Sequence, residues 1–433
     1  MSIHVISKSN NGEHATFELP PSDPSLLKKS SVRIRSSLLS LTSNNLTYAL
    51  YGTFLRWWDA YPVPQSAPAP YNNSAEWGIV PAWGLATVLE STLPEIPQGT
   101  VLFGFWPTGS HAVDLELTPS ELDGHWKEVS EHREHLMPLY NRYRVFDTQG
   151  KDVAEFAWDA AVGTIFIAGY LMSEYIFTSD PAVCPPIHPC GIVTGQGVQN
   201  WTAADADLSR AALVSLGAST KTARSMAYNL FQRPSGTGPL GFLQFTSSPG
   251  AISEAARALN EANGKSKFPV GTLGYQDVES AATWLASVEP TPERIVIADF
   301  GSRDGVLEGM VEDIKRTETL QGVEIVIIAV GNQQKVYTLG EIQAQQASFA
   351  ALNKVQMNTS DIYEAAIKLR GAADYFRAVD EAWKSWLENR ETAAPDLRLV
   401  WGKGIAGEDG IEAGWDKLCA GSVAPSEALI YRV

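Results

Sequence analysis

The stretch Arg210–Ser248 constrains the fold of this chain more than any other part of the sequence. An apolar run that ends at Leu216 is followed by a loop led by Gly217, by a helix-like run to Gln232, and by a second apolar run. This order predicts two parallel strands joined by a helix. A strand that leads directly into a helix presents unpaired N–H groups and the positive end of the helix dipole, and both favour an anion. The sequence therefore predicts a dinucleotide-binding site at this turn.

The loop itself matches neither of the two common phosphate-binding motifs. It is not Gly-x-Gly-x-x-Gly, and no glycine precedes Lys221-Thr222 at the spacing of a P-loop. An ordinary strand-to-helix turn with a Ser or Thr cap would have the same residues. The residues that we expect to contact the pyrophosphate are Gly217, Ala218, Ser219, Thr220, Lys221 and Thr222.

The residues after the second strand bear on which cofactor is bound. This strand ends in Thr246-Ser247-Ser248 instead of the Asp or Glu that holds an adenosine 2′-hydroxyl. Hydroxyl groups do not repel a 2′-phosphate as a carboxylate does, which favours NADPH over NADH, although no Arg follows directly. Asp299, Val330 and Gly331 follow later apolar runs, where ligands of open α/β sheets bind, and we expect them at the same site.

Composition excludes several classes of partner. The 433 residues suffice for about two domains. A net charge of −16 argues against nucleic acid or an anionic membrane as the main partner. No segment approaches the ~18 uninterrupted apolar residues of a membrane span. Three cysteines are too few, and odd in number, for a disulfide framework, so a reduced, cytoplasmic protein is expected.

The chain divides into a β-rich part and an α/β part. Residues 1–150 contain short alternating or aromatic runs between prolines and glycines, which is typical of a small barrel or sandwich. Residues 153–178 have a helical pattern, and strands then alternate with helices to about 338, which predicts a parallel sheet. The region 345–433 is expected to be mostly helical, with a final strand at Ala428–Val433.

Four residues of the β-rich part are candidate catalytic groups. A tyrosine hydroxyl is a proton donor and a histidine is a general acid. Tyr48 fits a packed aromatic ring at least as well, and a lone histidine such as His111 is more often structural. The candidates are Tyr48, His111, Tyr140 and Tyr143.

No metal site is expected. His132 and His135 lack a third ligand nearby, and Cys184-Pro-Pro-Ile-His188-Pro-Cys190 is better explained as a rigid loop than as a ligand set.

Several ordered motifs resemble an uncharacterised branch of the medium-chain dehydrogenase/reductase superfamily, catalogued as a domain of unknown function. The resemblance covers nearly the whole chain. It depends on Asn44-Asn45-Leu-Thr-Tyr48-Ala, Trp77-Gly-Ile-Val-Pro81-Ala-Trp83-Gly, Phe105-Trp-Pro107-Thr-Gly-Ser-His111, the segment from His132 to Tyr143, and Ser219-Thr-Lys221-Thr222-Ala.

The resemblance implies an α/β protein with a GroES-like catalytic domain and a Rossmann domain, and a cofactor cleft between them. The first would comprise residues 1–170, completed by 345–433, and the second residues 171–344. Zinc-free members reduce activated double bonds or quinones with NADPH. The loop and the Thr246–Pro249 strand end are also similar to those of fungal enoyl reductases that act on polyketides. By the same resemblance, Asn44, Asn45 and Trp83 would contact substrate.

Two segments depart from the family pattern, Asp299–Arg303 and Val330–Tyr337. The leading hypothesis is a zinc-independent, NADPH-dependent reductase of an apolar conjugated carbonyl, with fungal secondary metabolism as one setting, acting as a monomer or homodimer. The departures leave two alternatives open. One is a non-redox isomerase, cyclase or lyase on the same scaffold, and the other is a cofactor-sensing binding protein.

Overall fold

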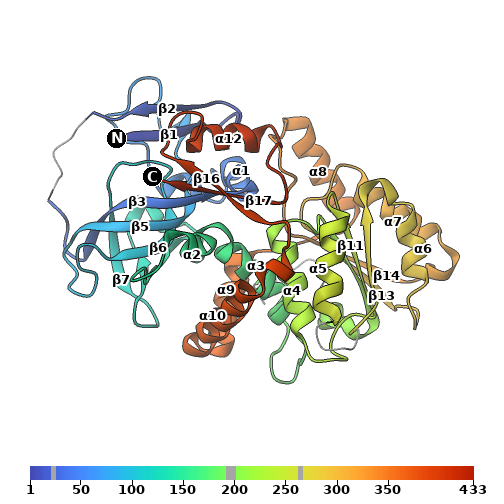
Figure 1. The fold of residues 1–433 in the computed structure, drawn as a ribbon. Coiled ribbons are helices and arrows are strands. Elements are labelled where there is room, and N and C mark those ends of the chain that lie inside the picture. The colour runs from blue at the N-terminus through green and yellow to red at the C-terminus, as the bar shows by residue number, and fades with distance from the viewer. Residues whose placement is uncertain (21–25, 192–200, 262–266) are drawn as a thin grey trace. The chain divides into compact units, whose positions relative to one another are not determined.

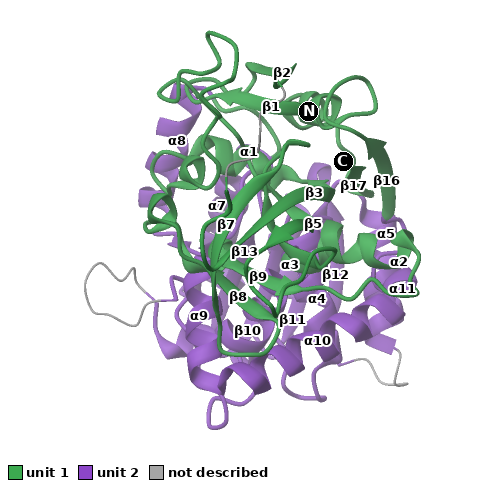
Figure 2. Ribbon diagram, turned by 90° about the vertical axis from the view of Figure 1, so that its left-hand side faces the viewer, with its two compact units in different colours: residues 1–164, 334–337, 398–433 green, residues 165–333, 338–397 purple. Residues whose placement is uncertain are grey.

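The computed structural model describes residues 1–20, 26–191, 201–261 and 267–433, in two compact units (Figures 1 and 2). Unit 1 comprises Met1–Thr164, Gln334–Tyr337 and Arg398–Val433. Unit 2 comprises Ile165–Gln333 and Thr338–Leu397. These bounds place the helices of residues 338–397 in unit 2, whereas the sequence led us to group everything after residue 345 with the first domain.

Unit 1 is built on an eight-stranded sheet, ordered β16-β17-β3-β5-β6-β9-β8-β7, in which β3 also pairs with β7. A three-stranded sheet, β2-β1-β4, accompanies it. The strands are β1 (Ser2–Ser7), β2 (His14–Glu18), β3 (Ser31–Leu41), β4 (Trp77–Gly78), β5 (Ala82–Ser91), β6 (Val101–Trp106), β7 (Val113–Pro119), β8 (His125–Glu128), β9 (Arg142–Val145), β16 (Arg398–Lys403) and β17 (Glu427–Arg432). Its α-helices are α1 (Ser43–Leu50), α2 (Val153–Trp158) and α12 (Ile411–Cys419).

The long strand β3 joins the two ends of this sheet. It pairs with β5 along most of its length and with β7 at its start. Register shifts at Arg33/Ile34 and Ser36/Leu38 bend the strand, as β-bulges do. The additional pairing with β7 gives the sheet the barrel-like closure that the short strands predict.

Unit 2 contains a six-stranded parallel sheet, ordered β12-β11-β10-β13-β14-β15. Its strands are β10 (Ala211–Leu216), β11 (Gly241–Thr246), β12 (Val270–Gly274), β13 (Arg294–Asp299), β14 (Glu324–Ala329) and β15 (Val355–Gln356). Its helices are α3 (Thr164–Leu171), α4 (Lys221–Gln232), α5 (Pro249–Glu261), α6 (Ser280–Ala286), α7 (Val306–Arg316), α8 (Leu339–Ala351), α9 (Thr359–Arg370), α10 (Ala372–Glu388) and α11 (Arg390–Ala393).

Helices cover both faces of the unit 2 sheet (Figure 1). On one face, Val214 and Ile297 pack in a buried cluster with Leu285 of α6 and Met310 of α7. On the other face, the ring of Phe231 of α4 packs against that of Phe242 of β11, with centres 6.1 Å apart and planes tilted by 56°. Strands buried on both sides are continuous apolar runs, which is why the sequence predicts them well. The α/β class with a GroES-like part and a Rossmann part is confirmed.

Three local expectations changed. Asn44–Tyr48, which lies in the part of the chain where the sequence indicated short strands, belongs to helix α1, whose start is capped by Thr42. The sequence did not indicate β12 or β16, both of which contain glycine. One helical segment, Val153–Ile176, is long and apolar enough to cross a membrane by length and composition alone, and just over half of its most apolar part is buried in the protein. This burial is typical of a core helix.

Candidate functional site

A glycine turn connects β10 to α4 at the carboxyl edge of the unit 2 sheet. Gly217 has φ +79°, a left-handed conformation that favours glycine. The turn is fixed on both sides, because the N–H of Ala218 donates to Phe245 O at 2.8 Å and that of Thr220 donates to Gly217 O at 2.9 Å. The turn that the sequence predicts here is therefore held by backbone hydrogen bonds, one of which joins it to strand β11.

Helix α4 begins at this turn, and some backbone N–H groups around its start have no acceptor within the helix. The Thr220 hydroxyl accepts a hydrogen bond from the N–H of Ala223 at 3.3 Å and so caps the helix. Within the described residues, the N–H groups of Ser219 and Thr222 donate to no protein acceptor. These two groups and the positive end of the α4 dipole make the turn suited to an anion.

A buried arginine that the sequence did not single out holds the turn in place. Arg224 Nε donates to Ser219 O at 3.0 Å, while its two terminal nitrogens contact the carboxylate of Asp396 at 2.6 and 2.9 Å. Burial raises the pKa of Asp396, but the hydrogen bonds and charge of Arg224 outweigh that effect, so the pKa lies below its ordinary value. Arg224 is thus a positioning residue for the turn. Only the tertiary fold reveals it, because Asp396 is distant in sequence.

The end of the neighbouring strand β11 carries only hydroxyl groups. The hydroxyl of Thr246 is buried and accepts from the N–H of Ser248 at 3.0 Å. Ser247 is exposed and Ser248 is half-buried. Both predicted serines therefore lie at the edge that carries the glycine turn, one strand away.

Asp299 ends β13, on the other side of β10. Its Oδ1 accepts hydrogen bonds from the N–H groups of Gly301 at 3.1 Å and Ser302 at 2.8 Å. Burial raises the pKa of its carboxyl above the ordinary value, although these hydrogen bonds oppose the shift. Its backbone oxygen accepts from the N–H groups of Val330 at 2.8 Å and Gly331 at 3.3 Å. Asp299, Val330 and Gly331 are thus brought together, as expected for strand ends of one sheet.

A tyrosine–arginine pair stands beside the glycine turn and was also missed by sequence reasoning. Tyr275 follows β12, and its hydroxyl lies near the backbone of Gly217. The guanidinium carbon of Arg303 lies 4.8 Å from the centre of the Tyr275 ring. A Tyr after a strand and an Arg after a turn are weak signals separately, because only the sheet order places them together.

In unit 1, two predicted tyrosines and one predicted tryptophan form a cluster. The indole N–H of Trp83 donates to the Tyr48 hydroxyl at 3.2 Å, and the side chains of Tyr140 and Asn44 lie near the same hydroxyl. The Tyr48 and Tyr140 rings meet edge-on with centres 5.7 Å apart. Trp57 and Phe105 complete the aromatic surroundings.

Burial makes both hydroxyls of this cluster weak acids. It raises the pKa of Tyr48 to about 12 and that of Tyr140 well above 10, against a smaller opposing effect of hydrogen bonds on Tyr48. Both therefore keep their protons at neutral pH and can donate hydrogen bonds.

Asn45 serves the fold. Its Oδ1 accepts from the N–H of Thr42 at 2.7 Å, which completes the capping box of α1. Its Nδ2 donates to Pro81 O at 2.9 Å. Both ends of the amide are therefore engaged within the protein, whereas the side chain of Asn44 is exposed and reaches Tyr48.

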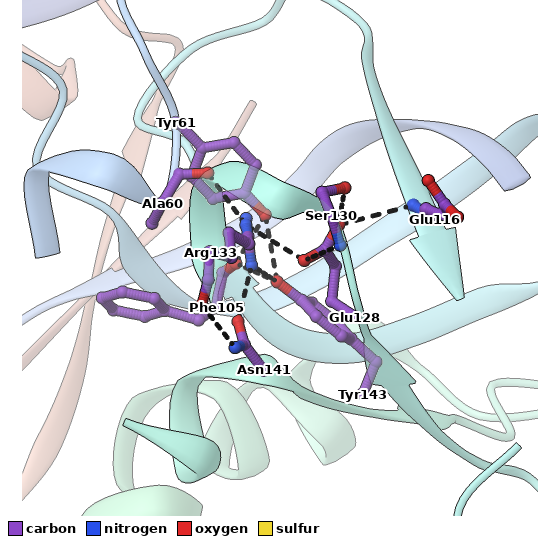
Figure 3. A network of polar contacts seen from close by, with 9 residues as sticks. All are labelled: Ala60, Tyr61, Phe105, Glu116, Glu128, Ser130, Arg133, Asn141 and Tyr143. Atoms are coloured by element: carbon purple, nitrogen blue, oxygen red, sulfur yellow. Dashed lines mark hydrogen bonds and ion pairs between the residues drawn. The ribbon is translucent and has the colours of Figure 1, made fainter. Parts of the chain in front are cut away.

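Tyr143 belongs to a different, fully internal network (Figure 3). Its hydroxyl donates to Phe105 O at 3.0 Å and accepts from Arg133 Nη1 at 2.8 Å. The hydroxyl of Tyr61 lies 3.2 Å away. These contacts fully occupy the Tyr143 hydroxyl.

The cation of this network is buried with its counter-ion. The side chains of Arg133 and Glu128 are both 0% exposed, with Arg133 Nε 3.6 Å from Glu128 Oε2. Arg133 Nε also donates to Ala60 O at 3.0 Å, and the guanidinium lies over the Tyr61 ring (Figure 3). This ion pair joins Arg133, in the segment after β8, to Glu128 at the end of β8.

His111 lies by the N-terminal strand. Two residues just before it in the sequence contact β1: Gly109 forms a β-bridge with Ile3, and the N–H of Ser110 donates to Ser2 O. Burial, with a smaller effect of the N-terminal charge, lowers the pKa of His111 to about 4, so it is neutral at pH 7. The structure thus places it on the β1 side of unit 1, in surroundings that suit a structural histidine.

Within the residues that the structure describes, no three His, Cys, Asp or Glu side chains are grouped as metal ligands. His132 and His135 are both exposed, on either side of the buried Arg133.

Three solved structures show how the chain compares with known folds. CurA from Vibrio vulnificus in complex with NADPH has 11% identity and a TM-score of 0.49, covering 100% of this chain and 99% of that one. Escherichia coli quinone oxidoreductase complexed with NADPH has 11% identity, a TM-score of 0.49 and full coverage of both chains. A mutant form of enoyl thioester reductase from Candida tropicalis has 9% identity, a TM-score of 0.47, and 100% and 99% coverage. The curated proteins contain no match.

The sequence motifs quoted above pointed to a family catalogued as a domain of unknown function, and a family comparison confirms it. The match extends over residues 39–424, so it includes the Tyr48 cluster, the glycine turn and Asp396. The chain therefore belongs to the family described as "Protein of unknown function (DUF2855)".

Proposed function

We propose that this protein is a zinc-independent reductase that uses NADPH to saturate an activated carbon–carbon double bond next to a carbonyl group. The observation that carries this proposal is the glycine turn after β10. The chain runs from β10 outward to β11 and β12 and then crosses to β13 on the other side of β10. Ligands of open α/β sheets bind at this kind of switch point, outside the carboxyl ends of the strands.

The residues at this edge fit a dinucleotide phosphate. The N–H groups of Ser219 and Thr222, at the start of α4, would hold the pyrophosphate. Ser247 and Ser248 would lie at the adenosine ribose, where the lack of a carboxylate admits a 2′-phosphate. The residues on the β13 and β14 side, Asp299, Val330 and Gly331, would contact the nicotinamide half. When bound, the cofactor supplies a hydride.

Unit 1 offers a proton-bearing hydroxyl for the carbonyl oxygen of the substrate. The hydroxyl of Tyr48 would donate a hydrogen bond to the oxygen on which negative charge develops as the enolate forms. Its high pKa keeps it protonated, and the hydrogen bond from Trp83 and the edge-on Tyr140 ring orient it. The aromatic rings around it favour an apolar substrate such as a polyketide-type enoyl group.

The test is incubation of the purified protein with conjugated enones, an enoyl thioester and a quinone, each with and without NADPH carrying deuterium at C4. A reductase gives a product in which one deuterium from the cofactor and one solvent proton have been added across the double bond. Tyr48→Phe is expected to lower kcat by about 10²–10³-fold, as loss of an oxyanion donor does, while NADPH binding is unchanged.

Two other outcomes contradict the proposal. A product formed without NADPH consumption and without deuterium, either at unchanged mass or by loss of a fragment, would instead identify a non-redox isomerase or cyclase, or a lyase. NADPH binding without turnover of any substrate in the panel would favour a cofactor-sensing binding protein.

A further inference from the structure

We infer that Arg303, stacked on Tyr275, is the residue that selects the phosphorylated cofactor, by binding the 2′-phosphate of the adenosine ribose. This inference depends on the proposed function, because it names the specificity determinant of the same dinucleotide site.

The sheet register places Tyr275 beside the hydroxyl-bearing end of β11. Thr246 of β11 pairs with Gly274 of β12, so Ser247 and Tyr275 are the next residues on two adjacent strands. The hydroxyl of Tyr275 lies near the backbone of Gly217, which lowers its pKa slightly against the larger, opposite effect of burial. Tyr275 therefore lies between the glycine turn and the serines, at the adenosine end of the proposed site.

Arg303 reaches this place from the other side of β10. It follows β13, and its backbone is held in a turn in which the N–H of Val306 donates to Arg303 O at 3.2 Å. The N–H of Phe300 donates to Leu216 O at 2.9 Å, so the start of the Arg303 segment runs beside the glycine turn. The sheet thus brings a cation to the strand end where the sequence alone offered none.

The charge of Arg303 is available for a ligand. The residue is exposed, and in the described part of the chain its guanidinium has no carboxylate within ion-pair distance. It lies over the Tyr275 ring, with which a cation makes a favourable contact. The nearby carboxylate of Asp299 is turned to the N–H groups of Gly301 and Ser302.

These groups together suit a phosphate monoester. A guanidinium presents several N–H donors in one plane, which matches phosphate oxygens, and the hydroxyl groups of Ser247 and Ser248 add neutral donors. An unphosphorylated ribose offers no charge to Arg303. The pair would therefore contribute to binding of NADPH and contribute little to binding of NADH.

The experiment compares four nucleotides by calorimetry on the full chain: NADPH, NADH, 2′,5′-ADP and 5′-AMP. Arg303→Gln is expected to weaken NADPH and 2′,5′-ADP by about 10–100-fold and to leave NADH and 5′-AMP within about 2-fold. Tyr275→Leu removes the stacking surface and is expected to weaken the same two ligands. Arg316→Gln is the matched control, because Arg316 is an exposed arginine of α7 whose ion pairs are local.

The outcomes separate this inference from the proposed function. If Arg303→Gln leaves the preference for NADPH over NADH unchanged, or weakens all four ligands equally, Arg303 is not the selecting residue, although the protein still binds the cofactor. If inorganic phosphate displaces 2′,5′-ADP at equal concentration, the site is a general anion site and the inference is wrong. If the unaltered protein binds none of the four, the proposed function itself fails.

Discussion

Tyr48 and Tyr143 of unit 1 are the same residue type, but their hydroxyl groups have different contacts and therefore suit different roles. The hydroxyl of Tyr143 is bonded to Arg133 and to Phe105 O, deep in the Figure 3 network. The hydroxyl of Tyr48 contacts an indole N–H and another tyrosine. The sequence named both as catalytic candidates because residue type alone cannot distinguish them. The contacts favour Tyr48 as the donor and Tyr143 as part of the framework.

The Arg133–Glu128 ion pair gives a prediction about stability. Arg133→Met is expected to lower the free energy of unfolding by about 3–5 kcal/mol, because it leaves the carboxylate of Glu128 buried without its partner. Urea unfolding followed by fluorescence measures this change. The control is Arg56→Met, which removes an exposed partner of Asp59 and is expected to cost about 1 kcal/mol or less. Equal losses in the two variants would show that the buried pair does not hold the segment.

His111 gives a prediction about pH. Its pKa is about 4 in the folded protein and near 6.5 when unfolded, so below pH 6.5 the unfolded chain binds the additional proton. Stability is therefore lost as the pH falls from 6.5 toward 4. Between pH 7 and pH 5 the His111→Gln variant is expected to lose about 2 kcal/mol less than the unaltered protein.

Urea unfolding at the two pH values measures this difference. The buried His4, whose pKa burial and the nearby His14 lower to about 3, adds to the acid sensitivity of both proteins equally. The exposed His135→Gln variant serves as the control and is expected to keep the full pH dependence. The prediction is wrong if His111→Gln loses as much stability as the unaltered protein.

At the level of elements, the β10–α4 turn depends on its glycine. Gly217→Ala is expected to cost about 1–2 kcal/mol, because a Cβ disfavours φ +79° even though the nearest atoms, of Phe300, are 3.6 Å away. Gly309→Ala, at an open position in α7, is expected to stabilise the protein by up to about 1 kcal/mol. Thermal unfolding of both variants measures the contrast, and a similar shift in both would contradict the assigned role of the turn.

The Arg224–Asp396 ion pair is predicted to stabilise the β10–α4 turn. Asp396→Asn keeps the size of the side chain but removes the charge that faces the buried Arg224. We expect a loss of about 2–4 kcal/mol in stability, together with a weaker affinity for NADPH because Ser219 is no longer held. Unfolding and calorimetry measure the two effects. A loss of stability with unchanged affinity would show that the pair does not position the turn.

The sequence predicted the strands and helices of unit 2 better than the side-chain contacts between them. Buried parallel strands such as β10 and β13 are continuous apolar runs, and a glycine before a polar helix start indicates the turn between strand and helix. Strand β12 was missed because two glycines interrupt its five residues. Arg303 and Tyr275 were missed for a related reason, since their contact depends on the strand order, which the local pattern does not contain.

At the level of the whole molecule, the net charge and the proposed ligand have the same sign. The chain carries a formal charge of −16, whereas NADPH is itself an anion. Backbone N–H groups, the α4 dipole and Arg303 supply local attraction for an anion at one edge of the unit 2 sheet. Binding at such a site is expected to depend on short-range donors more than on long-range attraction.

The most direct test of the central claim is calorimetric titration of the full chain with NADPH and with NADH, alongside a Gly217→Val variant. One NADPH is expected to bind per chain, more tightly than NADH. Binding is expected to be lost in the variant, whose β-branched side chain disfavours the left-handed turn. The proposed dinucleotide site is contradicted if neither cofactor binds at millimolar concentration, or if Gly217→Val binds NADPH as well as the unaltered protein does.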